Sequence, residues 1–221
     1  LVGSEMCIRD RSSDERVAAG AHLLAEAESG WDFNPRFDGR CMDFNPVDLN
    51  AFLYGMERNQ AQFMRELGME GAKEWDARAD RRGKLMRRFM VDSKTKLLYD
   101  YDYVNGKRST QYSAAPFAAL WQKAVGKDVA AAVVKNIGLL EGEGGIMTCA
   151  AGERAVPFQW DAPNGWAPIH FFAIKGLDNY GYTADAARIA RKYIDSMTSI
   201  YGKTGQLWEK FLSLIHISEP T

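Results

Sequence analysis

The chain has 221 residues, of which 46% are hydrophobic, and its 28 basic residues nearly balance its 29 acidic ones. This composition is typical of a globular protein, and the net charge of -1 argues against a nucleic-acid or anionic-membrane partner, which would need a concentrated basic face. The basic residues at positions 78 to 88 lie among acidic ones on a helix-like stretch, which favours a solvated helix face. No run approaches the roughly eighteen consecutive apolar residues of a membrane span.

The predicted elements are mainly helices, and the first covers residues 14–27. Asn45 followed by Pro46 predicts the N-cap and first residue of a second helix, which Gly68 ends. The apolar residues of this second helix are expected to face inward: Leu49, Phe52, Leu53, Met56, Phe63, Met64 and Leu67. Further helices are predicted over 70–91, 114–125, 127–137 and 167–180. Apolar periodicity from Ala186 to Tyr201 predicts a last helix, which Thr183 or Tyr182 opens and Gly202 closes.

Residues 97–108 differ from these helical stretches. Tyrosines at 99, 101 and 103 alternate with Asp100 and Asp102, and Asn105-Gly106 is a turn signal, so a short β-hairpin is predicted. Helices joined by loops that carry glycine, proline and aromatic residues predict an all-α fold. In such a fold paired helices stack, and the loops at one end form the site.

Residues 159–168 read Gln-Trp-Asp-Ala-Pro-Asn-Gly-Trp-Ala-Pro, which places two indoles, a carboxylate and two carboxamides within ten residues. Sugar rings have apolar faces that stack on tryptophan and hydroxyls that pair with Asp, Asn and Gln. The segment therefore predicts a sugar site. Trp160, Asp161, Asn164 and Trp166 are expected to line it, with Gln159 in support.

Three other segments add to this motif. Residues 28–37 read Glu-Ser-Gly-Trp-Asp-Phe-Asn-Pro-Arg-Phe, residues 46–53 read Pro-Val-Asp-Leu-Asn-Ala-Phe-Leu, and residues 205–211 read Gly-Gln-Leu-Trp-Glu-Lys-Phe. In order and content the four segments resemble the trehalases, the glycoside hydrolase family 37 that cleaves α,α-trehalose. Asn34-Pro35 replaces a pair of small residues of the family pattern, Phe37 replaces Trp, and Phe211 replaces Tyr. The resemblance covers residues 13–211.

The resemblance implies an (α/α)6 barrel, which needs twelve helices. The sequence supplies about seven, so the chain is expected to form a partial barrel from roughly the C-terminal half of the family domain. Such a half would leave apolar helix faces exposed, which predicts self-association. The arginines that clamp the sugars and the lid that follows the base are absent from the sequence, so the chain alone is expected to be inactive.

The resemblance also implies the chemistry: Asp32 as the catalytic acid and Glu209 as the catalytic base of an inverting hydrolase. Inversion needs the two carboxyl groups about 6.5 to 9.5 Å apart, with room for a water molecule. Trp31 beside Asp32 is expected to lower the local polarity and raise the pKa of the acid. Gly30 and Trp31 are expected to contact substrate. Arg36 is expected to bond a sugar hydroxyl or to hold Asp32 in place, and the alternative is a structural ion pair.

No cofactor and no metal are expected. Cys41 and Cys149 lack the spacing of a metal site or a disulfide framework, and His22 and His170 lack metal-ligand spacing. The expected partner is trehalose, and the oligomeric state is not predicted.

Two alternatives to a trehalase stay open. The first is an α-glucosidase or α-mannosidase of a related family on the same barrel, which tolerates the Gly-Trp-Asp segment but is not expected to carry the 159–168 motif. The second is a non-catalytic sugar-binding helical domain, against which the presence of both carboxylates in their motifs argues.

The two ends of the chain depart from the family pattern. Residues 1–12 and 213–221 are interpreted as translated sequencing-adaptor DNA and are excluded from the fold argument. No targeting signal can be identified, which leaves periplasmic, extracellular and cytoplasmic locations open.

Overall fold

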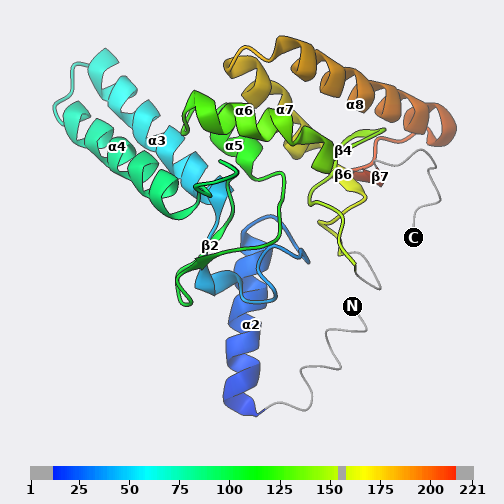
Figure 1. Cartoon of the computed structure of the whole chain (residues 1–221), viewed down its shortest axis with the longest axis horizontal. Helices are drawn as coiled ribbons and strands as arrows, with labels where there is room; N and C mark the ends of the chain where they lie inside the picture. The colour runs from blue at the N-terminus through cyan, green and yellow to red at the C-terminus, as the bar shows by residue number, and fades with distance from the viewer. Residues whose placement is uncertain (1–11, 154–157, 213–221) are drawn as a thin grey trace.

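A computed structural model describes residues 12–153 and 158–212 (Figure 1). Apart from Ser12, the two ends interpreted as adaptor-derived lie outside the described residues. The described part is mostly helical, with strands of two or three residues, so the prediction of an all-α fold with a short hairpin is confirmed. No helix in residues 12–153 and 158–212 is both long and apolar enough to cross a membrane.

Seven α-helices carry this part of the structure. Their bounds are α2 (Ser13–Glu28), α3 (Val47–Glu66), α4 (Ala72–Phe89), α5 (Pro116–Trp121), α6 (Lys127–Lys135), α7 (Ala167–Asn179) and α8 (Thr183–Thr204). Two 3₁₀ turns, η1 (Cys41–Asp43) and η2 (Ile137–Leu139), lie between them. The strands are β1 (Phe44–Asn45), β2 (Tyr101–Asp102), β3 (Lys107–Arg108), β4 (Glu141–Gly142), β5 (Gly145–Ile146), β6 (Asn164–Trp166) and β7 (Lys210–Leu212).

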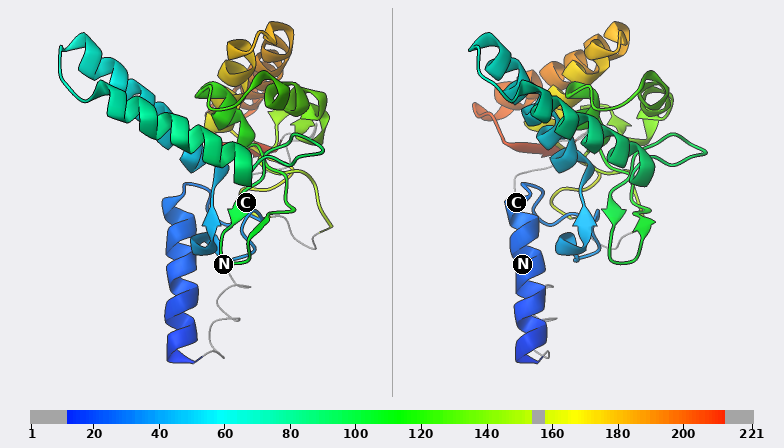
Figure 2. Two further views of the ribbon diagram at one scale, coloured as in Figure 1. Left: turned by 60° about the vertical axis from the view of Figure 1, so that its left-hand side comes forward. Right: turned by 90° about the vertical axis from the view of Figure 1, so that its left-hand side faces the viewer.

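The helices form two long pairs around a short central helix. Figures 1 and 2 show α3 beside α4 on one side and α7 beside α8 on the other, with α5 between the pairs and α2 extending away from them. Helix α5 contacts both α3 and α7, and its residues Pro116 to Leu120 are all buried. The core continues into α7 through Ile169 and Leu177 and into α8 through Ile189, all of which are almost fully enclosed.

Helix α3 begins one residue later than the sequence predicts. Asn45 is not its N-cap but lies in β1, where it pairs with Tyr101 of β2. Pro46 occupies the N-cap position, and the carboxylate of Asp100 accepts a hydrogen bond from the backbone N–H of Val47 at 2.8 Å. A distant aspartate therefore caps the helix, in a role that a local asparagine was predicted to fill. Gly68, at a φ of 67°, follows the helix end as predicted.

The predicted inward face of α3 is mostly wrong. Leu49, Met56, Phe63 and Leu67 are exposed, while Phe52 is partly buried and packs on the core. Half of the buried positions of α3 are instead small residues, Ala51, Gly55 and Ala61. Neighbouring segments come close on this side, since a Cβ added at Gly55 would lie 1.9 Å from the Gln122 side chain. The buried face of α3 is therefore the one that neighbouring segments approach closely, and not the one that carries the largest apolar side chains.

Charged groups join α3 to α4 along their length. Arg82 donates to both carboxylate oxygens of Glu57, at 3.0 and 2.8 Å. Arg58 pairs with Asp76 at 3.0 Å and also with Asp80. The basic stretch of α4 is thus partly used in ion pairs with acidic residues of this helix pair and of α6, where Asp128 binds Arg87.

Two other helices end at different residues from those predicted, and the predicted hairpin gains a strand. Helix α8 continues past Gly202 and ends at Gly205, which has a left-handed φ of 68°. Helix α5 stops at Trp121, because Lys123 has a positive φ of 54° that breaks the helical path. The predicted hairpin is present as β2 and β3, with Tyr101 opposite Arg108, and β1 adds a third strand that the sequence did not indicate.

Candidate active site

The segment that carries Asp32 leaves the end of α2 in a tight, hydrogen-bonded path. Gly30 has a φ of 76°, which a residue without a side chain adopts easily, and it is exposed. The side chain of Asn34 closes the turn, since its Nδ2 donates to the Trp31 carbonyl at 2.6 Å and its Oδ1 accepts from the Arg36 N–H at 2.8 Å. Asp32 is partly buried within this turn.

The buried carboxylate of Glu26 also supports this turn. Glu26, in the last turn of α2, is 5% exposed and accepts the backbone N–H of Asn34 at 2.8 Å. Burial raises the pKa of Glu26 above its ordinary value; the hydrogen bond from Asn34 opposes this shift, and the nearby charge of Asp32 adds to it. Sequence reasoning missed Glu26, because an acidic residue near a helix end normally lies in solvent.

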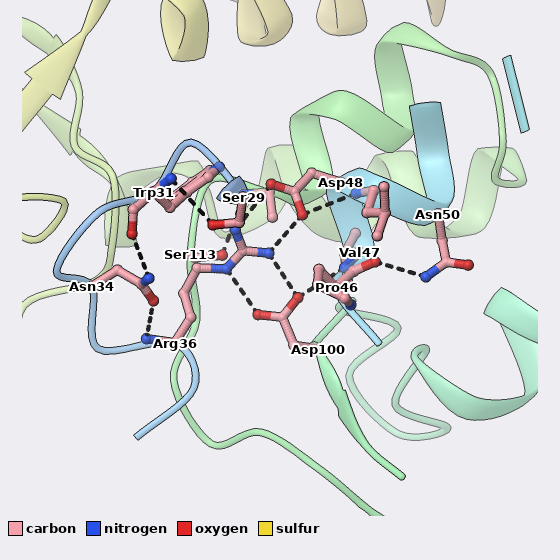
Figure 3. Close-up of polar contacts among 12 residues, drawn as sticks. Ser29, Trp31, Asn34, Arg36, Pro46, Val47, Asp48, Asn50, Asp100 and Ser113 are labelled. Atoms are coloured by element: carbon pink, nitrogen blue, oxygen red, sulfur yellow. Dashed lines mark hydrogen bonds and ion pairs between the residues drawn. The ribbon is translucent and has the colours of Figure 1, made fainter. Parts of the chain in front are cut away.

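Arg36 forms the most enclosed polar contact of the site (Figure 3). Its guanidinium binds two carboxylates bidentately, Asp48 at 2.9 and 2.8 Å and Asp100 at 2.9 and 2.8 Å. The Arg36 side chain has no exposed surface, and its Cζ lies 4.2 Å from the centroid of the Trp31 ring. Of the possibilities given for Arg36, the structure contains the structural ion pair; a bond to a sugar hydroxyl would require the guanidinium to leave this enclosure.

Three tryptophans join the Asp32 segment to the 159–168 motif. The rings of Trp31 and Trp160 lie 5.2 Å apart, and Trp160 stacks on Trp166 at 4.1 Å with an interplanar angle of 1°. The backbone N–H of Trp160 donates to the Phe33 carbonyl at 3.1 Å. All three rings are buried, and the indole N–H of Trp166 has no hydrogen-bond partner within the described residues. The structure thus brings together two motifs that lie more than 120 residues apart in the sequence.

The polar groups of the 159–168 motif shape its own loop. Asn164 donates from Nδ2 to the carbonyls of Phe158 and Gln159, at 3.2 and 2.9 Å. Asp161 accepts the N–H of Ala162 at 2.8 Å, and the Ala162–Pro163 peptide is cis. Asp161 and Asn164 are buried, whereas Gln159 is exposed. Contact of these residues with a sugar stays a prediction.

The segment that carries Glu209 is joined to the 159–168 motif through strand β7. Strand β7 pairs with β6 in antiparallel fashion, with Lys210 opposite Trp166 and Phe211 opposite Gly165. Glu209 directly precedes this strand and is exposed. A continuous series of contacts therefore runs from Trp31, beside Asp32, through Trp160 and Trp166 to the strand that follows Glu209.

His170 fixes the backbone of this region. Its side chain is fully enclosed, its Nδ1 lies 2.8 Å from the Trp166 carbonyl, and its Nε2 accepts the Ile146 N–H at 2.8 Å. Burial lowers the pKa of His170 to about 4, and the Trp166 carbonyl opposes that shift. The imidazole is therefore neutral near pH 7, with Nδ1–H as the donor, and it ties β5 to the start of α7.

Metal-binding side chains do not gather in the described part of the chain. Residues 12–153 and 158–212 contain no group of three or more His, Cys, Asp or Glu side chains arranged to hold a metal ion. Cys41 and Cys149 are both buried, and the Cys149 thiol donates to the Trp160 carbonyl at 3.5 Å. The polar groups available at the site are carboxylates, amides and backbone atoms.

Comparison with known proteins gives consistent similarities. The family model described as Trehalase matches residues 14–214. The periplasmic trehalase of Salmonella agona is 34% identical over 200 residues, which cover 86% of this chain and 34% of the relative. A probable trehalase of Eremothecium gossypii is 32% identical over 197 residues, covering 81% of this chain and 27% of the relative. The chain thus spans about a third of the length of the curated relatives it matches.

Solved structures agree with the sequence comparison. The neutral trehalase of Saccharomyces cerevisiae superposes with a TM-score of 0.88 at 28% identity, covering 94% of this chain and 41% of that one. A GH63 mannosylglycerate hydrolase of Thermus thermophilus superposes with a TM-score of 0.68 at 16% identity, which shows a shared fold alone. Because the family model matches most of the chain and the order of the four motifs agrees with it, the chain belongs to the trehalase family.

Proposed function

We propose that this chain forms part of the active site of an enzyme that hydrolyses α,α-trehalose to two glucose molecules. The observation that supports this most directly is the position of Trp160. Its ring lies against Trp31, beside Asp32, and stacks on Trp166, whose strand pairs with the one that follows Glu209. Two carboxylates whose segments meet on an aromatic cluster match what glycoside hydrolysis needs.

In this proposal Asp32 protonates the oxygen that leaves the broken glycosidic bond, and Glu209 removes a proton from the attacking water. The carboxylates act on opposite faces of the sugar, so the configuration inverts at the carbon that is attacked. Gly30 and Gln159 are exposed and offer polar groups to sugar hydroxyls. Trp31, Trp160, Trp166, Asp161 and Asn164 complete the proposed substrate-binding set, from which Arg36 is left out because its guanidinium is enclosed by Asp48 and Asp100. The buried indole N–H of Trp166 is a donor that a ligand can satisfy.

The activity belongs to the complete gene product rather than to residues 1–221 alone. The chain spans about a third of its curated relatives, and the expected arginine clamp and lid are not in its sequence. A misplacement of about 1 Å can cost on the order of a hundredfold in rate, so an incomplete site is expected to be inactive. Purified residues 1–221 should release no glucose from trehalose above the buffer rate.

The proposal is tested by replacing the two carboxylates in the complete gene product. Asp32→Ala removes the general acid and Glu209→Ala removes the general base. Each variant should therefore lower kcat by about 10² to 10⁴ while the fold is kept. Asp195→Ala, an exposed carboxylate on α8, is the control and should keep the wild-type rate. An Asp32→Ala rate within about tenfold of wild type would remove Asp32 from the mechanism.

Stereochemistry and substrate choice separate the proposal from its alternatives. Proton NMR during turnover should show one β-glucose and one α-glucose from each trehalose, since inversion acts at one of the two anomeric carbons. Two α-glucose molecules as first products would mean retention. Mannosylglycerate, named for the GH63 structure that shares the fold, is the comparison substrate. Faster hydrolysis of mannosylglycerate than of trehalose would overturn the substrate assignment, and sugar binding without turnover would indicate a binding domain.

A further inference from the structure

Two arginines in the segment after Asp32 each bind a pair of aspartates. Arg36 binds Asp48 and Asp100, and Arg40 binds Asp43 at 2.7 Å and Asp102 at 2.6 Å. Asp100 and Asp102 are two residues apart on an extended segment, so they share a face and each takes one arginine. The two clusters differ in their surroundings. The Arg40 side chain is 35% exposed and lies over Phe44, whereas Arg36 is fully enclosed and lies against Trp31.

Arg36 restrains the Asp32 segment in two ways. Its guanidinium carbon lies 4.2 Å from the Trp31 ring, which is also in contact with Trp160. Its backbone N–H binds the Asn34 side chain, which in turn binds the Trp31 carbonyl. Trp31 directly precedes Asp32 in the sequence, so both restraints act next to the proposed acid.

The aspartates fasten Arg36 to the start of α3. Asp48 lies in the first turn of that helix, and Asp100 accepts the N–H of Val47 at 2.8 Å in addition to its bonds with Arg36. Burial alone would lower the pKa of Arg36, but the charges of Asp100 and Asp48 raise it well above its ordinary value, so the guanidinium stays charged. The three groups together carry one net negative charge.

This compensation matters for an acid that must keep its proton. A buried cation without a partner favours the ionised form of a nearby carboxyl, which is the wrong form for protonating a leaving group. Glu26, in the last turn of α2, is a second acidic group close to this segment, and burial and the nearby charge of Asp32 both raise its pKa. With two aspartates bound to it, the guanidinium of Arg36 can therefore hold the Asp32 segment in place without favouring the ionised form of the proposed acid.

We propose that Arg36, held by Asp48 and Asp100, is a positioning residue for Asp32: it fixes Trp31 and the carboxyl beside it, and the paired aspartates more than offset its charge. This role rests on the proposed function of Asp32 as the acid. Arg36 itself touches neither the substrate nor the reacting atoms.

The first test compares Arg36→Lys with Arg40→Lys in the complete gene product. Lysine keeps the charge but cannot bind two carboxylates with a planar fork. Arg36→Lys should lower kcat on trehalose about a hundredfold, the cost of a misplacement of about 1 Å, with KM changed less than about threefold. Arg40→Lys should stay within about twofold of wild type. A folded Arg36→Lys enzyme with kcat within about threefold of wild type would overturn the proposal.

The second test uses the charge of the cluster and also covers a failure of Arg36→Lys to fold. Asp48→Asn keeps the size of the side chain but removes one of the two negative charges that offset Arg36. The descending limb of the kcat/KM profile should then move to lower pH, because the acid loses its proton earlier. Asp43→Asn, at the Arg40 cluster, should leave the limb in place. A purely structural role predicts a lower rate with an unmoved limb, and that result would refute charge compensation.

A third measurement separates this proposal from the proposed function. In the 221-residue chain labelled with ¹⁵N, Arg36→Lys should shift the Trp31 indole and Asp32 amide resonances, while Arg40→Lys should leave both unchanged. If the wild-type gene product does not hydrolyse trehalose but these shifts occur, the trehalase assignment fails and the positioning of Asp32 by Arg36 stands. Unchanged resonances in both variants would refute the positioning role whatever the activity.

Discussion

At the scale of single residues, the site depends on buried charges that the motifs do not reveal. The sequence motifs correctly place tryptophans and carboxylates in two segments that meet in space. Glu26 and Asp100 were not identified, because their partners are set by the fold: Arg36 and Asp100 are 64 residues apart, and Glu26 reaches Asn34 across the end of α2. Local patterns identify residue types that suit sugar chemistry. They do not show which charged groups will be enclosed.

Burial of Glu26 predicts a pH-dependent effect on stability. Its folded-state pKa is raised, so the stabilisation from its protonated form is present below the unfolded pKa of about 4.5 and is lost as pH rises through the folded value. Glu26→Gln keeps an acceptor for the Asn34 N–H without the charge. The variant should therefore gain stability relative to wild type as pH rises from 4 to 7.

Urea unfolding of the 221-residue chain, followed by circular dichroism at several pH values, measures this difference. Comparison of the two proteins at each pH removes the contribution of His170, which titrates in both. Glu28→Gln, an exposed neighbour on α2, controls for the change in net charge. A difference between Glu26→Gln and wild type that does not change between pH 4 and 7 would contradict the interpretation of Glu26 as a destabilised buried carboxylate.

At the scale of elements, sequence patterns located the seven α-helices of residues 12–153 and 158–212, but tertiary contacts set several of the ends and the buried faces. The start of α3 depends on Asp100, which lies 53 residues beyond Val47. Helix α8 continues through Gly202, whose backbone is not left-handed, and ends at Thr204, because the next residue, Gly205, has a left-handed φ of 68°. In α3 the apolar pattern indicated a helix correctly, yet small residues form its contact face. Periodicity alone does not distinguish the face that packs from the face that stays open.

The contact between α5 and α7 gives a prediction at this scale. A Cβ at Gly176 would lie 2.8 Å from the Leu120 Cβ, 2.9 Å from the Phe117 carbonyl oxygen and 3.1 Å from the Trp121 nitrogen. Two of these atoms belong to the backbone, so the helices would have to separate. Gly176→Ala should destabilise the chain by about 1 to 3 kcal/mol, as overpacking of a core does.

The matched control is Gly20→Ala in α2, where an added Cβ has no atom within 4 Å. That substitution should be neutral or stabilise the chain by up to about 1 kcal/mol, because alanine favours a helix over glycine. Thermal unfolding of both variants provides the measurement. Equal effects of the two substitutions would show that α5 and α7 can move apart at little cost.

At the scale of the whole molecule, large apolar side chains lie uncovered on several helices. The exposed set includes Leu49, Met56, Phe63 and Leu67 on α3, Phe171 on α7, and Ile194 and Tyr201 on α8. Contiguous exposed apolar surface favours association. The 221-residue chain is therefore expected to self-associate at micromolar concentration, in agreement with the sequence-based expectation for a partial barrel.

Sedimentation velocity checks this expectation. Replacing Met56 and Phe63 together by Glu should reduce association, because both side chains lie on the exposed face of α3. Replacing Asn59 and Gln62, exposed polar residues of the same helix, by Glu adds the same charge and should reduce association less. A wild-type chain that sediments as a monomer at about 100 µM would contradict the prediction.

The pairing of β6 with β7 also determines the order in which the parts of the site form. Gly165 and Phe211 face each other across 46 residues of chain, and the intervening residues include α7 and α8. Closing a loop of that length costs entropy that three residue pairs cannot offset on their own, so α7 and α8 must pack before β7 is held. During synthesis, the Asp32 segment, both partners of Arg36 and the tryptophan motif all leave the ribosome before Glu209. The proposed base is therefore the last part of this site to arrive, and a nascent chain carries the acid long before it can carry out the reaction.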